Sequence, residues 1–203
     1  MFTKKVIACT LVLSLWAAHA GATGDAKAGK TKITTCSACH GPNGISLAPN
    51  YPHQAGQGAP YLIKQINDIR SGARKVPEMT GMVENLSKQD IEDIAAYFAS
   101  LKPPQGQADP ESVQLAQKLY RGGDQKRQIP ACMACHGPTG SGNVLARFPR
   151  IAGQTPAYIK KQLVDFREGA RTNDGDTKIM RDIAEKLSNK EVTALASYIS
   201  GLR

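Results

Sequence analysis

The stretch that decides the fold is Cys36-Ser37-Ala38-Cys39-His40-Gly41-Pro42, and it recurs as Cys132-Met133-Ala134-Cys135-His136-Gly137-Pro138. Further along the chain, residues 51–57 match residues 148–154, and residues 68–74 match residues 165–171, both at an offset of 97. A repeat on this scale has to be recognised before a fold is assigned, because it divides the chain into equivalent units. The 203 residues therefore form two halves related by internal duplication.

Each repeat carries a Cys-x-x-Cys-His run, which is the attachment signature of a c-type haem. Two thiols about one helical turn apart can add to the two vinyl groups of one porphyrin, and the adjacent histidine then lies beneath the iron. The sequence therefore predicts two covalently bound haem c groups. The expected attachment residues and iron ligands are Cys36, Cys39 and His40 in the first half and Cys132, Cys135 and His136 in the second.

Three other readings of the cysteines compete with haem attachment. Four of the five cysteines lie beyond residues 1–20, and two disulfides would be usual for four cysteines in an exported protein. A structural zinc site needs four ligands, and only the first half offers a second histidine, His53, whose repeat partner is Arg150. We expect His53 to lie at the surface. A redox-active dithiol needs a βαβ context, and the sequence has no strand pattern of useful length.

The remaining ligand of each iron should come from a residue that is repeated in both halves. The first half offers Met79 and Met82. The pairs Leu86-Ser87 and Leu187-Ser188 set an offset of 101, at which Met79 falls on Met180 and Met82 falls on Ile183. We therefore expect Met79 and Met180 to bind the irons. The alternative is that Met82 binds and Met79 fills the core, since methionines commonly pack in cores.

Residues around each ligand can also be anticipated. A metal-bound histidine usually donates its other ring N–H to a carbonyl group, and Pro52 and Pro149 follow His40 and His136 by 12 and 13 residues. Their alternative role is ordinary turn chemistry. Side chains that could bond or neutralise the haem propionates, unless they are helix-surface charges and core tyrosines, are Tyr61, Tyr158, Arg70, Arg74, Arg167 and Arg171.

Both halves read as helices joined by loops. The last helix of each half follows a capping-box start, Ser87 with Asp90 and Ser188 with Glu191, and carries an apolar stripe. A middle helix is expected over residues 61–70 and 158–167. A first helix should run from an Asp25 cap toward Cys36, with residues 114–120 in its counterpart. The sequence thus predicts an all-α fold.

Domain boundaries follow from the repeat. Residues 104–110 belong to a proline-rich segment that reads as a short, stiff linker. It separates a domain at residues 21–103 from a domain at residues 111–203. Residues 21–104 hold nine basic and seven acidic side chains, and residues 105–203 hold fifteen and ten. Because nearby cations favour a reduced haem, the second haem should have the higher reduction potential.

Residues 1–20 combine Lys4 and Lys5, a short apolar run and Ala18-His19-Ala20. This pattern is typical of a cleaved secretory signal peptide, although an uncleaved anchor is the alternative. The apolar run is too short for a membrane-spanning helix. We expect an exported protein whose formal charge falls from +9 to +7 when both lysines are removed. Four ionised haem propionates would reduce this charge to about +3. The remaining excess of cations suits an acidic partner or an anionic membrane surface; the alternative is a solvated face with no partner.

The chain resembles the dihaem cytochrome c4 family. The resemblance is carried by both Cys-x-x-Cys-His motifs, by the Pro-x-x-Ala-Gly-Gln segments, and by residues 78–82, 167–176 and 186–190. It covers essentially the whole mature chain, although His53 and Gln54 depart from the usual residues. It implies two tandem class I cytochrome c domains, each with histidine and methionine on the iron: His40 with Met79, and His136 with Met180.

The resemblance also implies a function. Members of the family carry single electrons in the periplasm, often toward terminal oxidases, and many associate with the membrane surface. We therefore expect an electron-transfer protein rather than an enzyme, without a small-molecule substrate or nucleic acid. Its partners would be a quinol-oxidising complex or another donor, and a terminal oxidase or another acceptor. The alternatives are a haem subunit of a larger dehydrogenase and a dihaem peroxidase, which needs an open iron.

Overall fold

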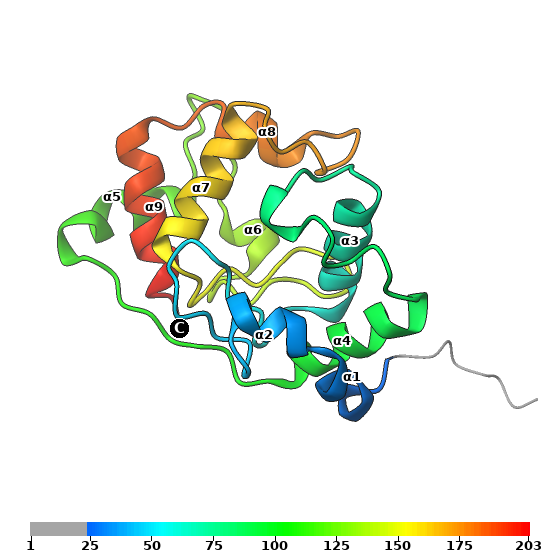
Figure 1. Ribbon diagram of the computed structural model, residues 1–203. Coiled ribbons are helices and arrows are strands. Elements are labelled where there is room, and N and C mark those ends of the chain that lie inside the picture. Colours follow the sequence, from blue (N-terminus) through cyan, green and yellow to red (C-terminus); the bar gives the residue numbers. More distant parts are fainter. Residues whose placement is uncertain (1–23) are drawn as a thin grey trace, which may run out of the picture.

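The computed structural model describes residues 24–203, so the expected signal peptide at residues 1–20 lies outside the described residues. The described chain folds into helices and loops (Figure 1). The first half contains α1 (Ala26–Lys32), α2 (Thr34–His40), α3 (Ala59–Arg70), the 3₁₀ turn η1 (Pro77–Met79) and α4 (Lys88–Ser100). The second half contains α5 (Pro110–Gly122), α6 (Met133–His136), α7 (Pro156–Arg167), α8 (Ile179–Ala184) and α9 (Asn189–Ser200).

Helix packing repeats between the halves. The first helix of each half packs against its last helix, α1 on α4 and α5 on α9, and the middle helices α3 and α7 pack against the same partners. Figure 1 shows α1 and α4 on one side of the molecule and α5 and α9 on the other. Within residues 24–203 the only β structure is a pair of isolated bridges in loops, Asp124 with Ile129 and Asn143 with Phe148. The prediction of an all-α fold is confirmed.

Local capping explains where the helices begin. Ser87 and Ser188 both form capping boxes, so the last helix of each half begins where the sequence indicates. Asp25 caps α1, but this helix ends at Lys32 and α2 begins separately at Thr34, so the cysteine motif has a helix of its own. Helix α5 begins at Pro110, the last residue of the expected linker, because proline suits a first helical position after a capping aspartate.

The connecting segment lies against both halves. A Cβ atom on Gly56 would come within 2.8 Å of the Pro103 ring, and one on Gly153 would come within 2.1 Å of the Pro104 carbonyl oxygen. Both glycines also have positive φ angles, 71° and 73°, which side chains rarely adopt. The two equivalent glycines therefore allow Pro103, the last residue of the first domain, and Pro104 of the linker to pass closely over the boundary between the halves.

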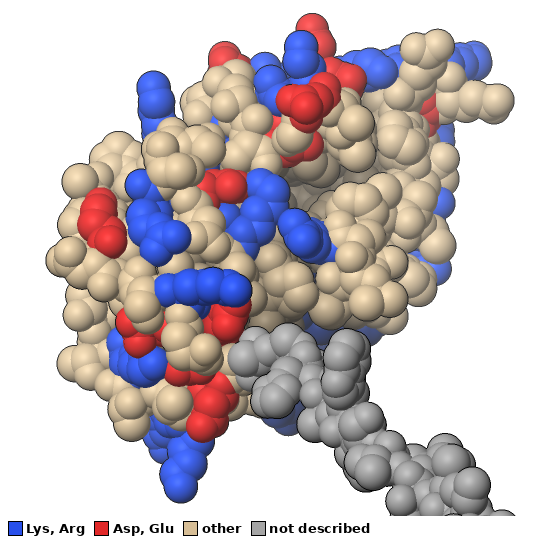
Figure 2. Space-filling model, turned by 90° about the vertical axis from the view of Figure 1, so that its right-hand side faces the viewer, with Lys and Arg blue, Asp and Glu red and all other residues tan. Residues whose placement is uncertain are grey.

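Charges of both signs cover the visible surface. Figure 2 shows Lys and Arg side chains interspersed with Asp and Glu side chains, on a face that is also hollowed near its centre. On this face the basic excess of the chain does not form one continuous patch. None of the helices between residues 24 and 203 is long and apolar enough to cross a bilayer.

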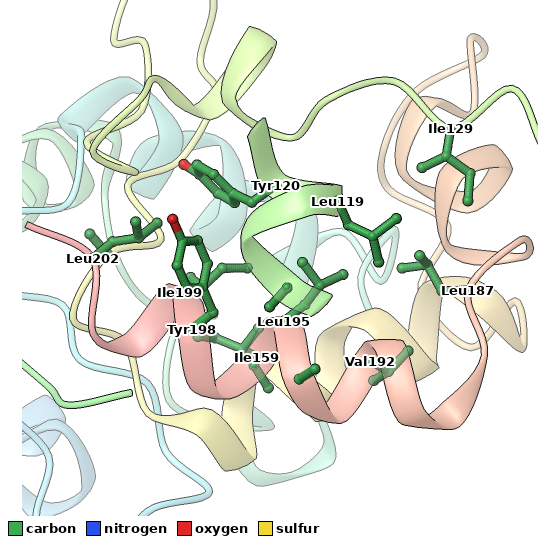
Figure 3. Close-up of a cluster of buried hydrophobic side chains, with 14 residues drawn as sticks. Leu119, Tyr120, Ile129, Ile159, Leu187, Val192, Leu195, Tyr198, Ile199 and Leu202 are labelled. Carbon is green, nitrogen blue, oxygen red and sulfur yellow. The ribbon is translucent and has the colours of Figure 1, made fainter. Parts of the chain in front are cut away.

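The larger apolar core lies in the second half. Figure 3 shows Leu119 and Tyr120 of α5 facing Leu195, Tyr198 and Ile199 of α9. The first half has a smaller cluster of buried side chains, namely Ile33, Leu62, Ile94, Ala95, Tyr97 and Phe98. A buried tyrosine in each half also reaches the cysteine motif. Tyr97 donates to the Pro42 carbonyl (3.1 Å), and Tyr120 donates to the Gly137 carbonyl (2.6 Å).

Candidate haem sites

The two cysteine motifs lie on short helices that end in glycine. Helix α2 contains Cys36, Cys39 and His40, whereas α6 begins just after Cys132 and ends at His136. The next residue in each case is a glycine with a φ angle of 76° or 79°, which stops the helix directly after the histidine. The four cysteines of the two motifs are free thiols, and helical spacing puts the two of each motif about one turn apart.

Both motifs line one large cavity between the halves. Its volume is about 760 Å³, and its walls include all four cysteines, His40 and His136. A pocket for one drug-sized ligand measures roughly 300–1,000 Å³. Apolar side chains such as Phe98, Ile159 and Phe166 contribute to the wall. The cavity therefore offers apolar surface to large flat groups at the cysteines of both motifs.

The two histidines are held in the same way. His40 and His136 are only 7% and 8% exposed. Nδ1 of His40 donates to the carbonyl oxygen of Pro52, and Nδ1 of His136 donates to that of Pro149, each over 2.9 Å. Burial lowers the pKa of both imidazoles, which favours the neutral ring that binds metals. With Nδ1 occupied, Nε2 is the nitrogen left to bind an iron.

Two of the four methionines in the described residues line the cavity. Met79 and Met180 both line the cavity, Met79 at the end of η1 and Met180 within α8. Met82 is 49% exposed and does not line it, and neither does Met133. The local structures differ because the second half carries extra residues in the loop at 172–176, just before α8.

Two buried arginines cross from one half to the other. Arg74 donates to the Tyr158 hydroxyl and to Gln162 Oε1, both over 2.9 Å. Arg171 donates to the Tyr61 hydroxyl (3.2 Å) and to Gln65 Oε1 (3.0 Å). Gln65 Oε1 also accepts from Arg74 (2.8 Å). The glutamines were not among the expected site residues, although their match at offset 97 was visible in the sequence.

These arginines lack acidic partners. They are 9% and 8% exposed, and no ion pair of either is found within residues 24–203. Arg150, which also lines the cavity, has a buried Nε atom without a hydrogen-bond partner. Buried cations require compensation, and carboxylates of a bound haem fit this need. Arg70 and Arg167 do not line the cavity, and they donate instead to the carbonyl oxygens of Leu86 and Leu187.

His53 is not at the surface as expected. Its side chain is half-buried at the boundary between the halves, where its Nδ1 accepts from the Ser46 backbone N–H over 3.0 Å. Burial is the main cause that lowers its pKa, followed by the nearby His40. No local sequence pattern predicts this burial, because it depends on how the second half docks.

Zinc and dithiol chemistry fit the cysteines poorly. Burial raises the pKa of the Cys132 thiol to about 11 and also raises that of Cys36, whereas metal binding and disulfide exchange need a thiolate. Within residues 24–203 no group of three or more His, Cys, Asp and Glu side chains could hold a metal ion. The free thiols, the buried histidines and the buried arginines without acidic partners fit covalently attached haem.

Comparisons with known proteins decide the family. A family model described as Cytochrome c matches residues 26–102 and 113–203. Cytochrome c4 of Azotobacter vinelandii is 55% identical over 209 residues, which cover 98% of this chain and 99% of that protein. The chain belongs to the cytochrome c4 family. It is a dihaem electron-transfer cytochrome with two tandem cytochrome c domains and two covalently bound haem c groups, and its partners are redox proteins.

Two further similarities extend this assignment. The crystal structure of reduced recombinant cytochrome c4 from Pseudomonas stutzeri matches with a TM-score of 0.87 and 56% identity, covering 89% of this chain and 100% of that chain. A protein of Stutzerimonas stutzeri named thiosulfate dehydrogenase electron acceptor is 37% identical over 171 residues, covering 82% of this chain and 78% of that protein. The cytochrome c4 family thus has relatives that are named for a particular donor.

Proposed function

We propose that the protein is a periplasmic carrier that moves single electrons between redox protein partners. Its donor would be a quinol-oxidising complex or another reductant, and its acceptor a terminal oxidase or another oxidant. The observation that carries this proposal is the pairing of one buried histidine and one methionine per half at a shared cavity, His40 with Met79 and His136 with Met180.

The ligand pairs support transfer of electrons rather than catalysis. A bound haem supplies a reversible one-electron couple, and histidine with methionine on the iron raises its reduction potential. In this proposal Cys36, Cys39, Cys132 and Cys135 would hold the two rings, and Met79 and Met180 would bind the irons and leave no place on them for a substrate. The chain's own residues then hold the groups, exclude water and balance charge, so we infer that the protein is not an enzyme.

We further propose export and loose membrane association. Residues 1–20 would be removed as a signal peptide, leaving domains at residues 21–103 and 111–203 and a linker at 104–110. The mature chain would carry a formal charge of +7, or about +3 once four haem propionates are ionised, and this excess would attract it to anionic lipid. Mature holoprotein should bind vesicles of anionic phospholipid at low salt and leave them at high salt. Equal binding to vesicles of neutral lipid would contradict this electrostatic association.

The carrier role can be tested by oxidation with respiratory membranes. Reduced holoprotein is mixed with washed membranes that contain a terminal oxidase, and its absorbance is followed. We expect the membranes to remove two electrons per chain, and cyanide to block this oxidation. If the same membranes oxidise a small-molecule mediator but leave the reduced protein unchanged, a terminal oxidase is not its acceptor.

One relative favours a second candidate. Because a thiosulfate dehydrogenase electron acceptor resembles this chain, the protein could instead serve one dehydrogenase as its haem subunit or dedicated acceptor. The two roles differ in purification from the native cell. A general carrier elutes alone in chromatography, whereas a dedicated subunit elutes together with a large dehydrogenase.

A further inference from the structure

Two equivalent glutamines bond across the boundary between the halves. Gln154 of the second half donates through Nε2 to the His53 carbonyl oxygen (2.9 Å) and accepts at Oε1 from the His53 backbone N–H (2.8 Å). Gln57 of the first half donates to the Arg150 carbonyl oxygen and accepts from the Arg150 backbone N–H, both over 2.9 Å. Each side-chain amide therefore forms two hydrogen bonds with the backbone of one residue in the other half, as a neighbouring β-strand would.

Both glutamines are fixed in place. Gln57 is 6% exposed and Gln154 is 9% exposed. Each Oε1 atom also accepts from the backbone N–H of the next residue, Gly58 or Thr155, over 3.0 Å. A buried side chain with every polar atom paired has little freedom to move. The two hydrogen bonds to each glutamine therefore restrain the backbone of the residue that it bonds in the other half.

The two residues that the glutamines bond, His53 and Arg150, directly follow the prolines whose carbonyl groups orient the histidines. His53 directly follows Pro52, whose carbonyl accepts from His40 Nδ1, and Arg150 directly follows Pro149, whose carbonyl accepts from His136 Nδ1. Pro52 cannot be held through a backbone N–H of its own, because proline has none. The position of its carbonyl thus depends on the residue beside it, which Gln154 fixes from the other half.

We propose that each glutamine is a positioning residue for the iron of the opposite half. Gln154 would hold the carbonyl that bonds His40, and Gln57 would hold the carbonyl that bonds His136. This inference rests on the proposed role of the two histidines as iron ligands. It goes beyond that role because it makes each iron depend on a residue that belongs to the other domain.

Loss of either glutamine is expected to raise the reduction potential of the haem in the opposite half. A carbonyl that accepts from Nδ1 makes the imidazole a stronger electron donor, which stabilises the oxidised iron. When the carbonyl moves away, this bond weakens and the reduction potential of that haem rises. Loss of Gln154 should therefore raise the potential of the haem at His40, and loss of Gln57 should raise that of the haem at His136.

The test uses full-length holoprotein and the variants Gln154→Ala and Gln57→Ala. Redox titrations are followed by NMR signals from residues 36–40 and 132–136, so that each haem reports its own potential. The Nδ1–H resonances of His40 and His136 are recorded in the reduced state. Gln154→Met and Gln57→Met preserve the side-chain volume without the amide, and they replace the alanine variants if those fold poorly.

Thr155→Val provides the matched control. It removes another hydrogen bond across the boundary, from Thr155 Oγ1 to the Pro49 carbonyl (2.6 Å), without touching His53 or Arg150. It also removes the cap of α7, so it reports the combined effect of a weakened boundary and a weakened helix start. We expect both potentials and both Nδ1–H signals to stay close to wild type in this variant.

The proposal predicts a crossed pattern of responses. Gln154→Ala should raise the potential and shift the Nδ1–H signal at His40 more than at His136, and Gln57→Ala should do the reverse. If each variant acts mainly on the haem of its own half, or equally on both, the proposal is wrong. A wild-type protein that lacks histidine and methionine ligation would instead overturn the proposed function, so the two failures are distinguishable.

Discussion

At the scale of single residues, the choice of Met79 and Met180 rests on two independent observations. The repeat aligns these two methionines with each other, and both line the cavity, whereas Met82 is half exposed outside it. The side chain of Met79 therefore has access to a haem that Met82 lacks. Substitution separates the two residues directly.

We predict that Met79→Ala and Met180→Ala each remove about half of the far-red sulfur-to-iron absorbance of the oxidised protein. The affected haem should also fall in reduction potential, because it loses the sulfur ligand, and should bind carbon monoxide when reduced. Optical spectra and a redox titration measure these effects. Met82→Ala serves as the control, and loss of the band in this variant would transfer the ligand role to Met82.

At the scale of single elements, each last helix is tied down at its start by a cation from an earlier segment. In the second half, Arg127 bonds Glu191 of α9 over 2.5 Å and Asp124 over 2.8 Å. In the first half, Lys32 bonds Asp90 and Asp93 of α4 over 2.7 Å and 2.6 Å. The partners differ, but both cations reach a capping-box acid at the helix N-terminus.

The Arg127 contact predicts a pH dependence. The Arg127 guanidinium lowers the pKa of Glu191 from 4.5 to about 2. Because the folded pKa lies below the unfolded one, the stabilisation is complete above about pH 4.5 and is lost as the pH falls toward 2. Arg127→Ala should lower the free energy of unfolding at neutral pH, and its difference from wild type should narrow in acid.

Urea unfolding at a series of pH values measures this difference. Lys126→Ala is the matched control, because Lys126 lies in the same loop and its side chain forms no ion pair within residues 24–203. If the difference in free energy of unfolding between wild type and Arg127→Ala stays constant down to pH 2, Glu191 is not the group involved.

The capping box of α9 gives a second prediction for this element. Ser188 accepts from the Glu191 backbone N–H, which would otherwise lack a partner. Replacing such a cap with alanine costs about 1 kcal/mol. Ser188→Ala should therefore lower the free energy of unfolding by this amount in urea titrations. A value indistinguishable from wild type would mean that Glu191 and Arg127 hold the helix start without the serine.

At the scale of the whole molecule, the two halves differ in charge. The second half carries a larger excess of basic side chains, fifteen against ten, than the first, nine against seven. Positive charge favours the reduced haem, so the haem at His136 should have the higher potential. The difference should shrink at high salt, because exposed charges are screened.

A redox titration resolved by NMR signals from the two cysteine motifs measures this difference in the intact protein. Repeating it at low and high ionic strength isolates the contribution of exposed charge. A higher potential at His40, or a difference that salt leaves unchanged, would mean that buried groups such as Arg74, Arg171 and Arg150 dominate.

Much of this architecture could be predicted because its signals lie within short stretches of sequence and because each of them occurs in both halves. Capping residues, apolar stripes and the cysteine motifs specify helices within a few residues of themselves, and the repeat confirmed each of them by a second copy. The separation of α1 from α2 was missed, because no local signal at Ile33 breaks the helix.

Contacts between the halves could not be predicted in the same way. The burial of His53, the crossing of Arg74 and Arg171, and the grip of Gln57 and Gln154 all depend on how two folded units dock. A sequence repeat marks these positions as equivalent, but equivalence does not reveal that each residue acts on the opposite half. The charge of the buried arginines was visible, whereas their lack of acidic partners was not.

The most direct test of the central claim is an optical redox titration of the holoprotein, with haem counted per chain. We expect two haems, two positive potentials and a full far-red sulfur-to-iron band in the oxidised form. One high and one low potential, with part of that band missing and carbon monoxide bound on reduction, would contradict this expectation. Such a result would mean that one iron is open, and it would favour an enzyme over a carrier.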